Sequence, residues 1–160
     1  MRLFLLIIGF SILGSCAVFQ PKEFNTEALE EKLVTVNRDS ITLKEIIKKN
    51  TSEKQFVQVF ATYCPVSQDS FEDVIAFQKE NPSIDYVFLS VDHSYHDWKR
   101  GLENIKVKGK HYYIPKKGKG KLGQFLKLKT IPRFMVLDNK GNIILYKTSS
   151  LSERLKSKIK

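Results

Sequence analysis

Cys64 is the residue of this chain that is best suited to chemistry. It lies in the segment 60–67 (FATYCPVS), where an apolar strand is expected to give way to a helix. The start of a helix presents unpaired backbone N–H groups and the positive end of the helix dipole, and both favour a thiolate over a thiol. The sequence therefore predicts a nucleophilic cysteine at a helix start.

Ser67 stands three residues after Cys64, where a dithiol redox motif carries its second cysteine. A dithiol enzyme attacks a disulfide with its first cysteine and releases the resulting mixed disulfide with its second, so a serine removes the second step. No base is identifiable beside Ser67 in the sequence, and we interpret its hydroxyl as a helix-end hydrogen-bonding group. The pair predicts monothiol chemistry in which an external thiol resolves the adduct on Cys64.

The other cysteine, Cys16, belongs to a predicted export signal. Arg2 precedes an apolar stretch at 3–13 that has the length of a signal-peptide core and is too short to remain as a membrane-spanning helix. Residues 13–16 (LGSC) resemble the bacterial lipobox, which implies cleavage before Cys16 and lipid on its sulfur. We expect a lipoprotein anchored to a membrane of the bacterial cell envelope and facing the periplasm or the exterior. An ordinary signal peptide and a short uncleaved anchor are the alternatives.

The length of the chain suits one domain behind this signal. We predict a signal peptide at 1–15, a lipid-bearing tether at 16–28, a folded domain at 29–150 and a basic tail at 151–160. No cysteine pair remains in the mature body, so an internal disulfide cannot form there.

The net charge of +10 is placed unevenly. Nine lysines and no acidic residue lie between Lys106 and Lys129. Such a field attracts an anionic membrane surface or an acidic protein, or it belongs to a solvated loop that aids solubility. No recognition motif with interleaved aromatic residues accompanies the lysines, so we expect no nucleic-acid partner.

Strand and helix patterns alternate along the chain. The capping-box spacing of Thr42 and Glu45 predicts a short helix. Pro65 suits the first turn of a second helix, and Asn81-Pro82 ends it. The pattern loosens between Asp92 and Trp98. The expected elements are a helix at 42–49, a strand at 56–60, a helix from 65, a strand at 84–91, a brief helix at 122–128 and a hairpin of 133–137 with 142–147. This order predicts an α/β sheet with a parallel part and an antiparallel edge.

At this point the chain resembles a known family. The segments 37–43, 60–67, 89–92 and 130–138, with Trp98 between the last two, occur in the order found in the thioredoxin fold. The resemblance spans roughly 36–146 and is closest to the membrane-tethered TlpA-like thiol-disulfide oxidoreductases. It implies a central mixed β-sheet flanked by helices, protein thiols or disulfides as partners, and no cofactor.

The resemblance also implies a substrate site. Pro132 would follow Ile131 through a cis peptide bond, pack beside Cys64 and present the Ile131 backbone to a bound chain, with Tyr63 and Pro65 completing the binding surface. A trans proline at the first residue of a strand is the alternative. The chain departs from the family at Ser67 and at Ser70, where tethered relatives often carry a glutamate for proton transfer.

Three functions remain in competition. The first is monothiol exchange at Cys64, and the second is a peptide-binding module without turnover. The third is a thiol peroxidase, suggested by the Cys-Pro step, although Ala61 stands where peroxidases of this fold carry a threonine or serine.

A metal site is the weaker interpretation of the polar segment that follows the second strand. Asp92, His93, His96 and Asp97 would share a face only in a helix, and no cysteine ligand lies nearby in sequence. We expect them to be surface polar residues of a loop, with Trp98 packed in the core or at its rim.

Overall fold

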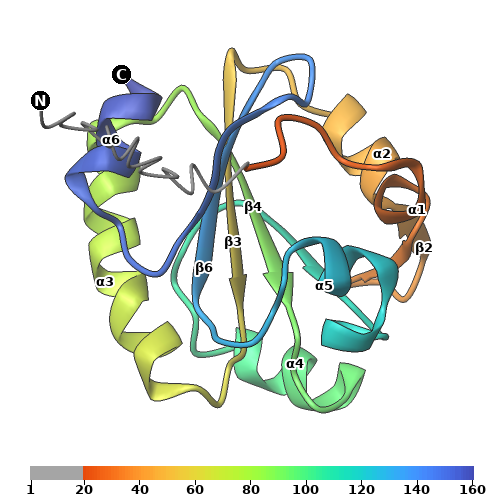
Figure 1. The fold of residues 1–160 in the computed structure, drawn as a ribbon. Coiled ribbons are helices and arrows are strands. Elements are labelled where there is room, and N and C mark those ends of the chain that lie inside the picture. The colour runs from red at the N-terminus through yellow and green to blue at the C-terminus, as the bar shows by residue number, and fades with distance from the viewer. Residues whose placement is uncertain (1–19) are drawn as a thin grey trace, which may run out of the picture.

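The computed structural model describes residues 20–160, which build a seven-stranded mixed sheet with helices on both faces (Figure 1). The strands lie in the order β2-β1-β5-β4-β3-β6-β7. Their bounds are β1 Lys32–Thr35, β2 Ser40–Thr42, β3 Lys54–Phe60, β4 Asp85–Ser90, β5 Lys110–Tyr113, β6 Arg133–Asp138 and β7 Ile143–Thr148. β3, β4 and β5 run parallel to one another, whereas β6, β7, β1 and β2 add antiparallel pairs at the two sides.

The described part also contains six α-helices and one short 3₁₀ helix. Their bounds are α1 Thr26–Leu29, α2 Leu43–Lys48, α3 Pro65–Glu80, α4 Tyr95–Leu102, η1 Lys117–Lys119, α5 Lys121–Phe125 and α6 Glu153–Ile159. Figure 1 shows α3 and α6 on one face of the sheet, α1, α2 and α5 on the other, and α4 beyond the arrowheads of β3 and β4.

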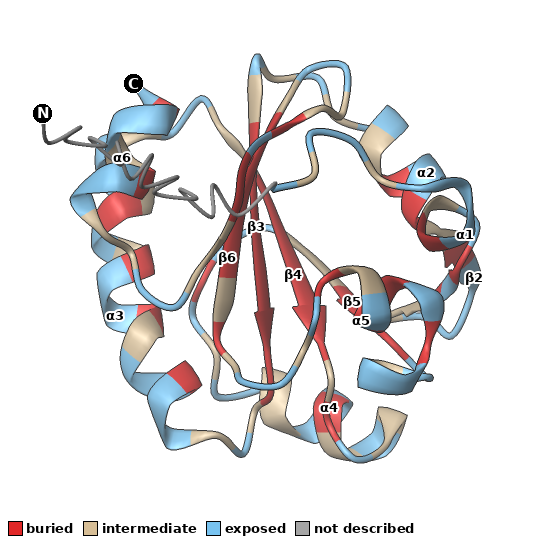
Figure 2. Cartoon of the chain, viewed as in Figure 1, coloured by how far each residue is buried: buried red, intermediate tan, exposed pale blue. Residues whose placement is uncertain are grey.

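Two apolar cores follow from the alternation of side chains along the central strands. Val57 and Val59 of β3 point towards α1, α2 and α5, and pack in a cluster with Ile46 and Leu122. Neighbouring side chains point the other way and pack against α3, α4 and α6; this second cluster includes Phe56, Phe60, Phe71, Val74, Phe77, Phe88, Trp98, Phe134 and Leu155. Figure 2 shows that burial is concentrated in the sheet and on the inner sides of the helices.

The topology gathers three segments at one edge of the sheet. β3 and β4 are parallel, so the residues after Phe60 and after Ser90 emerge together, and the Val91 N–H donates to the Phe60 carbonyl at 2.8 Å. β6 runs antiparallel to β3, and its first residue, Arg133, lies opposite Val59. We call this edge the carboxyl end of β3.

Most of the predicted elements are present. The helix after Thr42 forms with the expected capping box, α3 begins at Pro65 and ends before Asn81, and β6 and β7 form the predicted hairpin. The observed α5 is shorter than the predicted helix at 122–128.

Three expectations about regular structure were wrong. The segment after Asp92 is a helix, α4, whose N-cap Ser94 accepts a hydrogen bond from the Asp97 N–H. The tether predicted for 16–28 overlaps α1, and Ala28 lies in the core because α1 packs under α5. The basic tail predicted for 151–160 contains α6, because Leu155 and Ile159 supply an apolar side that packs on the α3 face.

The predicted signal peptide at 1–15 and the predicted lipid-bearing Cys16 lie outside the described residues. Within 20–160, none of the helices combines the length and the apolarity needed to cross a bilayer.

Candidate active site at the start of α3

Cys64 is the N-cap residue of α3 and its side chain is half-buried. Within residues 20–160 it is the only cysteine. Its own backbone N–H donates to the Ala61 carbonyl at 3.2 Å, and its carbonyl accepts the first helical bond from the Gln68 N–H at 3.0 Å. An N-cap side chain normally accepts from the backbone N–H of the second or third helical residue, but Cys64 makes no such bond. The N–H groups of Val66 and Ser67 therefore have no side-chain cap, and an ionised sulfur at the N-cap position would be a suitable acceptor for them.

The loop before Cys64 is fixed from the neighbouring strand by Asp92. Thr62 donates to this carboxylate twice, from its backbone N–H at 3.1 Å and from its hydroxyl at 2.6 Å. Ser90 adds a hydroxyl donor at 2.6 Å. Asp92 is fully buried, so the expectation of a surface loop residue was wrong for it. Its donors hold the carboxylate and, through Thr62, the approach to the thiol.

α4 approaches this loop closely at Gly101. A Cβ placed on Gly101 would overlap the Thr62 side chain, so a larger residue there would push Thr62 away from Asp92. Gln68 ties the loop to α3 itself, because its side-chain amide donates to the Thr62 carbonyl at 2.6 Å.

Ser67 lies beneath the helix start rather than on the surface. It is fully buried, and its hydroxyl has no hydrogen-bond partner in the described part of the chain. The interpretation of this hydroxyl as a helix-end hydrogen-bonding group was therefore wrong. A buried hydroxyl without a partner contributes no hydrogen bond to the helix start. The small size of the serine side chain is then the property that suits it to this buried position.

Sequence reasoning missed Gln58, which lies in β3 behind the helix start. Gln58 is fully buried, its amide donates to the Ser70 hydroxyl at 2.9 Å, and that hydroxyl donates to the Ser67 carbonyl at 2.7 Å. Ser70, which stands at the family's glutamate position, thus belongs to a neutral network under α3. A polar residue in the middle of an otherwise apolar strand was the signal that could have identified Gln58.

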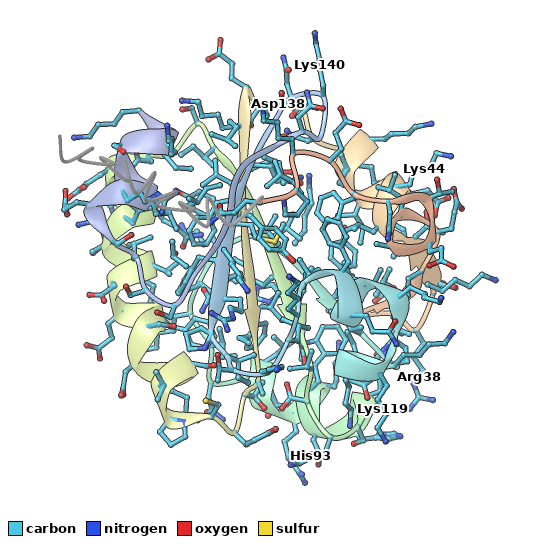
Figure 3. The ribbon with its side chains drawn as sticks, in the orientation of Figure 1. Arg38, Lys44, His93, Lys119, Asp138 and Lys140 are labelled. Atoms are coloured by element: carbon cyan, nitrogen blue, oxygen red, sulfur yellow. The ribbon has the colours of Figure 1, made fainter. Side chains whose placement is uncertain are left out.

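The outer surface of the site is apolar and aromatic. Tyr63 is 52% exposed and Val66 is 60% exposed, the two highest values among large hydrophobic side chains of residues 20–160. The Tyr63 ring stacks on the His93 ring, with their centroids 4.3 Å apart. Lys117 donates to the His93 carbonyl at 2.7 Å. Figure 3 shows His93 and Lys119 at this end of the molecule, with Lys140 at the other.

The Ile131–Pro132 peptide bond is cis, as the resemblance implied. Pro132 is buried and Ile131 is half-buried. They immediately precede Arg133, which lies opposite Val59, so they reach the same edge of the sheet as Cys64. The structure thus brings Tyr63, Cys64, Pro65, Ile131 and Pro132 to the carboxyl end of β3.

The three histidines have separate environments. His93 stacks on Tyr63, and His96 makes a hydrogen bond of 3.1 Å with Arg38. His111 stacks on Phe88 within the α3-side core, and burial lowers its pKa. No group of three potential ligands among His, Cys, Asp and Glu of residues 20–160 could hold a metal ion.

Comparison with known proteins identifies this arrangement. Residues 53–143, more than half of the chain, match the family described as thioredoxin-like. The match contains β3, Cys64, α3, β4 and Pro132. The fold class expected from the sequence, a thioredoxin-like α/β fold with a central mixed sheet, is confirmed. A search of curated protein sequences gives no match.

Solved structures share the fold at low sequence identity. A candidate thiol:disulfide interchange protein DsbE from Chlorobium tepidum aligns with a TM-score of 0.67 and 18% identity, over 88% of this chain and 96% of that chain. The thioredoxin domain of a thiol-disulfide oxidoreductase from Bacteroides vulgatus aligns with 0.64 and 14%, over 86% and 100%. A secreted disulfide oxidoreductase from Mycobacterium tuberculosis aligns with 0.61 and 11%, over 84% and 98%.

Proposed function

The chain belongs to the thioredoxin-like family, and we propose that it acts as a monothiol thiol-disulfide oxidoreductase through Cys64. The observation that carries the proposal is the half-buried thiol at the uncapped start of α3. Solved structures similar to this chain include thiol-disulfide oxidoreductases, which supports thiol-disulfide exchange as the class of reaction.

The reaction is an exchange of sulfur partners. The Cys64 thiolate attacks one sulfur of a partner disulfide, the partner's S–S bond breaks, and the second sulfur leaves as a thiolate that takes a proton from water. The thiolate of an external thiol then attacks the partner's sulfur in the mixed disulfide, forms a new disulfide with it and releases the Cys64 thiolate. The α3 N–H groups stabilise the thiolate before the attack and again when it leaves. Ser67 has no sulfur to perform the release, so the mixed disulfide persists until the external thiol arrives.

The test uses the full chain with Cys16→Ser, in which Cys64 is the only thiol. We expect Cys64 to form a stable mixed disulfide with 2,2′-dipyridyl disulfide, a neutral reagent. Glutathione should then remove the thiopyridyl group and restore the free thiol. Cys64→Ala in the same background is the control and should form no adduct. An intact chain in which Cys64 stays unmodified would contradict the proposal.

A second variant tests the missing step. Adding Ser67→Cys should allow an internal disulfide, because the N-cap and third helical positions are one helical step apart, and insulin reduction should then appear or rise. A folded variant that never closes the disulfide under oxidising conditions would mean that positions 64 and 67 do not have dithiol geometry.

A peptide-binding module is the second candidate, and the exposure of Tyr63 and Val66 favours it. These side chains flank Cys64 and could hold an extended partner without turnover. The peroxidase alternative gains no support, since Ala61 has no hydroxyl and the Thr62 hydroxyl is committed to Asp92.

For the cellular setting we propose an exported protein that is anchored through lipid on Cys16. The lipobox-like segment 13–16 supports this proposal. Mass spectrometry of the mature N-terminus should find lipid on Cys16, and Cys16→Ser should release the protein from membranes or block its processing. A mature protein that begins elsewhere without lipid would contradict it.

A further inference from the structure

Four cationic residues lie in the segments on either side of the loop that carries Ile131 and Pro132 and in the strand next to it. Lys127 and Lys129 precede this loop, Arg133 follows it at once, and Lys147 lies on the neighbouring strand β7. We call these four residues the basic flank. None of them forms an ion pair with a carboxylate of residues 20–160, although other lysines, such as Lys44 and Lys110, do.

The packing of α5 against β7 places these side chains together. The Tyr146 hydroxyl donates to the Phe125 carbonyl, and the two rings pack edge to face with centroids 5.7 Å apart. This contact holds the end of α5 beside β7, and the chain then turns through Lys127, whose φ is 50°. Burial, together with the charges of Arg133, Lys127 and Lys129, lowers the pKa of Lys147, as expected of cations that repel one another.

Arg133 carries the most specific signal in the flank. Its Nε is buried and donates to no described atom, and no carboxylate of the described residues balances its charge. Arg133 as a whole is half-buried, and its buried Nε–H, left without an acceptor, is costly unless water or a partner supplies one. The residue directly follows Pro132, at the edge where a partner must approach Cys64.

The α3 side of the site carries carboxylates. Asp69 and Glu72 are exposed on the first turns of α3, and Glu72 lines a surface cavity of about 530 Å³ together with Thr62, Gln68 and Lys106. An anionic bilayer laid across this end would meet these carboxylates as well as the basic flank. A chain that crosses the site can place its acidic residues on one side only.

We propose that the basic flank selects partner polypeptides that carry acidic residues on the Ile131–Pro132 side of their reactive cysteine. The inference rests on the proposed exchange at Cys64 and names the class of its partner. Charge of this kind raises the rate of encounter and fixes the orientation more than it raises affinity.

The test compares two synthetic peptides, each with one cysteine activated as a mixed disulfide with 2-thiopyridine. Both peptides carry their charged residues on one side of the cysteine only, glutamates in the first and lysines in the second, and each is made in two versions, with these residues before or after the cysteine. Attack by Cys64 breaks the S–S bond and releases thiopyridone, whose absorbance gives the rate. The full chain with Cys16→Ser is used in neutral detergent, and each rate is divided by that of the same variant with 2,2′-dipyridyl disulfide.

We expect the acidic peptide to react about tenfold faster than the basic one at low salt, and the preference to shrink at high salt. Lys127→Glu with Lys129→Glu should bring the ratio to about one or below. Lys127→Gln with Lys129→Gln should give an intermediate ratio, which guards against misfolding of the reversed variant.

The matched control is Lys48→Glu with Lys140→Glu, which changes the net charge equally at the opposite end. Lys48 ends α2 before β3 begins, and Lys140 follows β6, where Lys54 lies opposite Asp138. This control should keep the wild-type ratio.

A ratio of about one in the wild type, or one that the control lowers as much as the flank variant does, would overturn the inference while leaving exchange intact. So would a flank variant that changes only the retention of the protein by phosphatidylglycerol in mixed micelles, because the cations would then serve a lipid surface. Failure with 2,2′-dipyridyl disulfide would overturn the exchange itself and, with it, this inference.

Discussion

The starts of α2 and α3 treat the unpaired backbone N–H groups of the first helical turn in opposite ways. At α2, the Thr42 hydroxyl accepts from the Glu45 N–H at 3.2 Å, and the Glu45 carboxylate accepts from the Thr42 N–H at 2.7 Å. At α3, Cys64 occupies the N-cap position and accepts nothing. α1, α4 and α6 also have side-chain caps, supplied by Asn25, Ser94 and Ser152.

The difference shows that the start of α3 lacks the stabilising side-chain cap that α2 has. α3 is the longest helix of residues 20–160, yet its start has neither a polar cap nor an acidic residue in the first turn. The loop before it is held from outside by Asp92. A start that is held from outside can leave its N–H groups available to a sulfur that changes charge and partner during exchange.

Removing the outside support should have the largest effect. Asp92→Ala leaves the Thr62 and Ser90 donors unpaired in a buried place, so the free energy of unfolding should fall by about 3 kcal/mol. Urea unfolding measures it. Asp69→Ala, on the exposed side of α3, is the control and should change stability by no more than about 0.5 kcal/mol. Equal losses would mean that the loop is held by something other than Asp92.

Removing the cap of α2 should cost less and leave the chemistry unchanged. Thr42→Ala should lower the free energy of unfolding by about 1 kcal/mol, with no change in adduct formation at Cys64. A slower reaction at Cys64 would show that the two helix starts are coupled.

The capping box of α2 should also respond to pH. Hydrogen bonds from the backbone and side chain of Thr42 lower the pKa of Glu45 from its ordinary 4.5. A carboxyl whose folded pKa is lowered contributes stability above its unfolded pKa and loses it as the pH falls through the folded value. Thr42→Ala should therefore differ less from the wild type in acid than at neutral pH, as measured by urea unfolding at both. The backbone N–H of residue 42 remains in this variant, so a constant difference would mean that the Thr42 hydroxyl contributes nothing to the stabilisation of the Glu45 carboxylate.

Filling the missing cap of α3 should separate stability from function. Cys64→Ser supplies a good N-cap oxygen, so the free energy of unfolding should rise by about 0.5–1 kcal/mol while adduct formation is lost. Thermal unfolding measures the gain. A variant no more stable than the wild type would indicate that the thiol already satisfies the helix start.

The smallest expected effect is at Ser67. Ser67→Ala removes a buried hydroxyl without a partner, so stability should stay unchanged or rise by up to about 1 kcal/mol. Ser70→Ala is its matched comparison and should cost about 1 kcal/mol, since that hydroxyl bonds both Gln58 and the Ser67 carbonyl. A loss at Ser67 as large as that at Ser70 would restore the hydrogen-bonding interpretation of Ser67.

The sequence predicted the parts of the fold that depend on local rules. Thr42 and Glu45 announce α2, Pro65 and Asn81 bound α3, and strong strand-forming residues mark β3 and the hairpin. The helix α4 was not predicted because Trp98, the residue that packs in the core, is isolated among polar neighbours. The segment therefore has no visible apolar period. The helices α1 and α6 were not predicted because short helices depend more on tertiary packing than on their own sequence. Here the packing residues are Ala28 and Leu155.

The candidate site was predictable in its centre and not in its support. Cys64 and Pro132 follow from their neighbours in sequence and from the family resemblance. Asp92 and Gln58 act through contacts between residues 30 and 12 positions apart, which only the folded chain creates. The charge of 106–129 was visible, but its association with Arg133 and Lys147 depends on the packing of α5 against β7.

The central claim is that Cys64 exchanges disulfides without a resolving partner in its own chain. Mass spectrometry of the wild-type protein isolated from its own cells, with free thiols blocked during lysis, tests it most directly. The account predicts a fraction of Cys64 in mixed disulfides with other proteins or with a small thiol, removable by reductant. Cys64 found entirely as the free, blocked thiol, under growth conditions both reducing and oxidising, would contradict the account and leave the binding module.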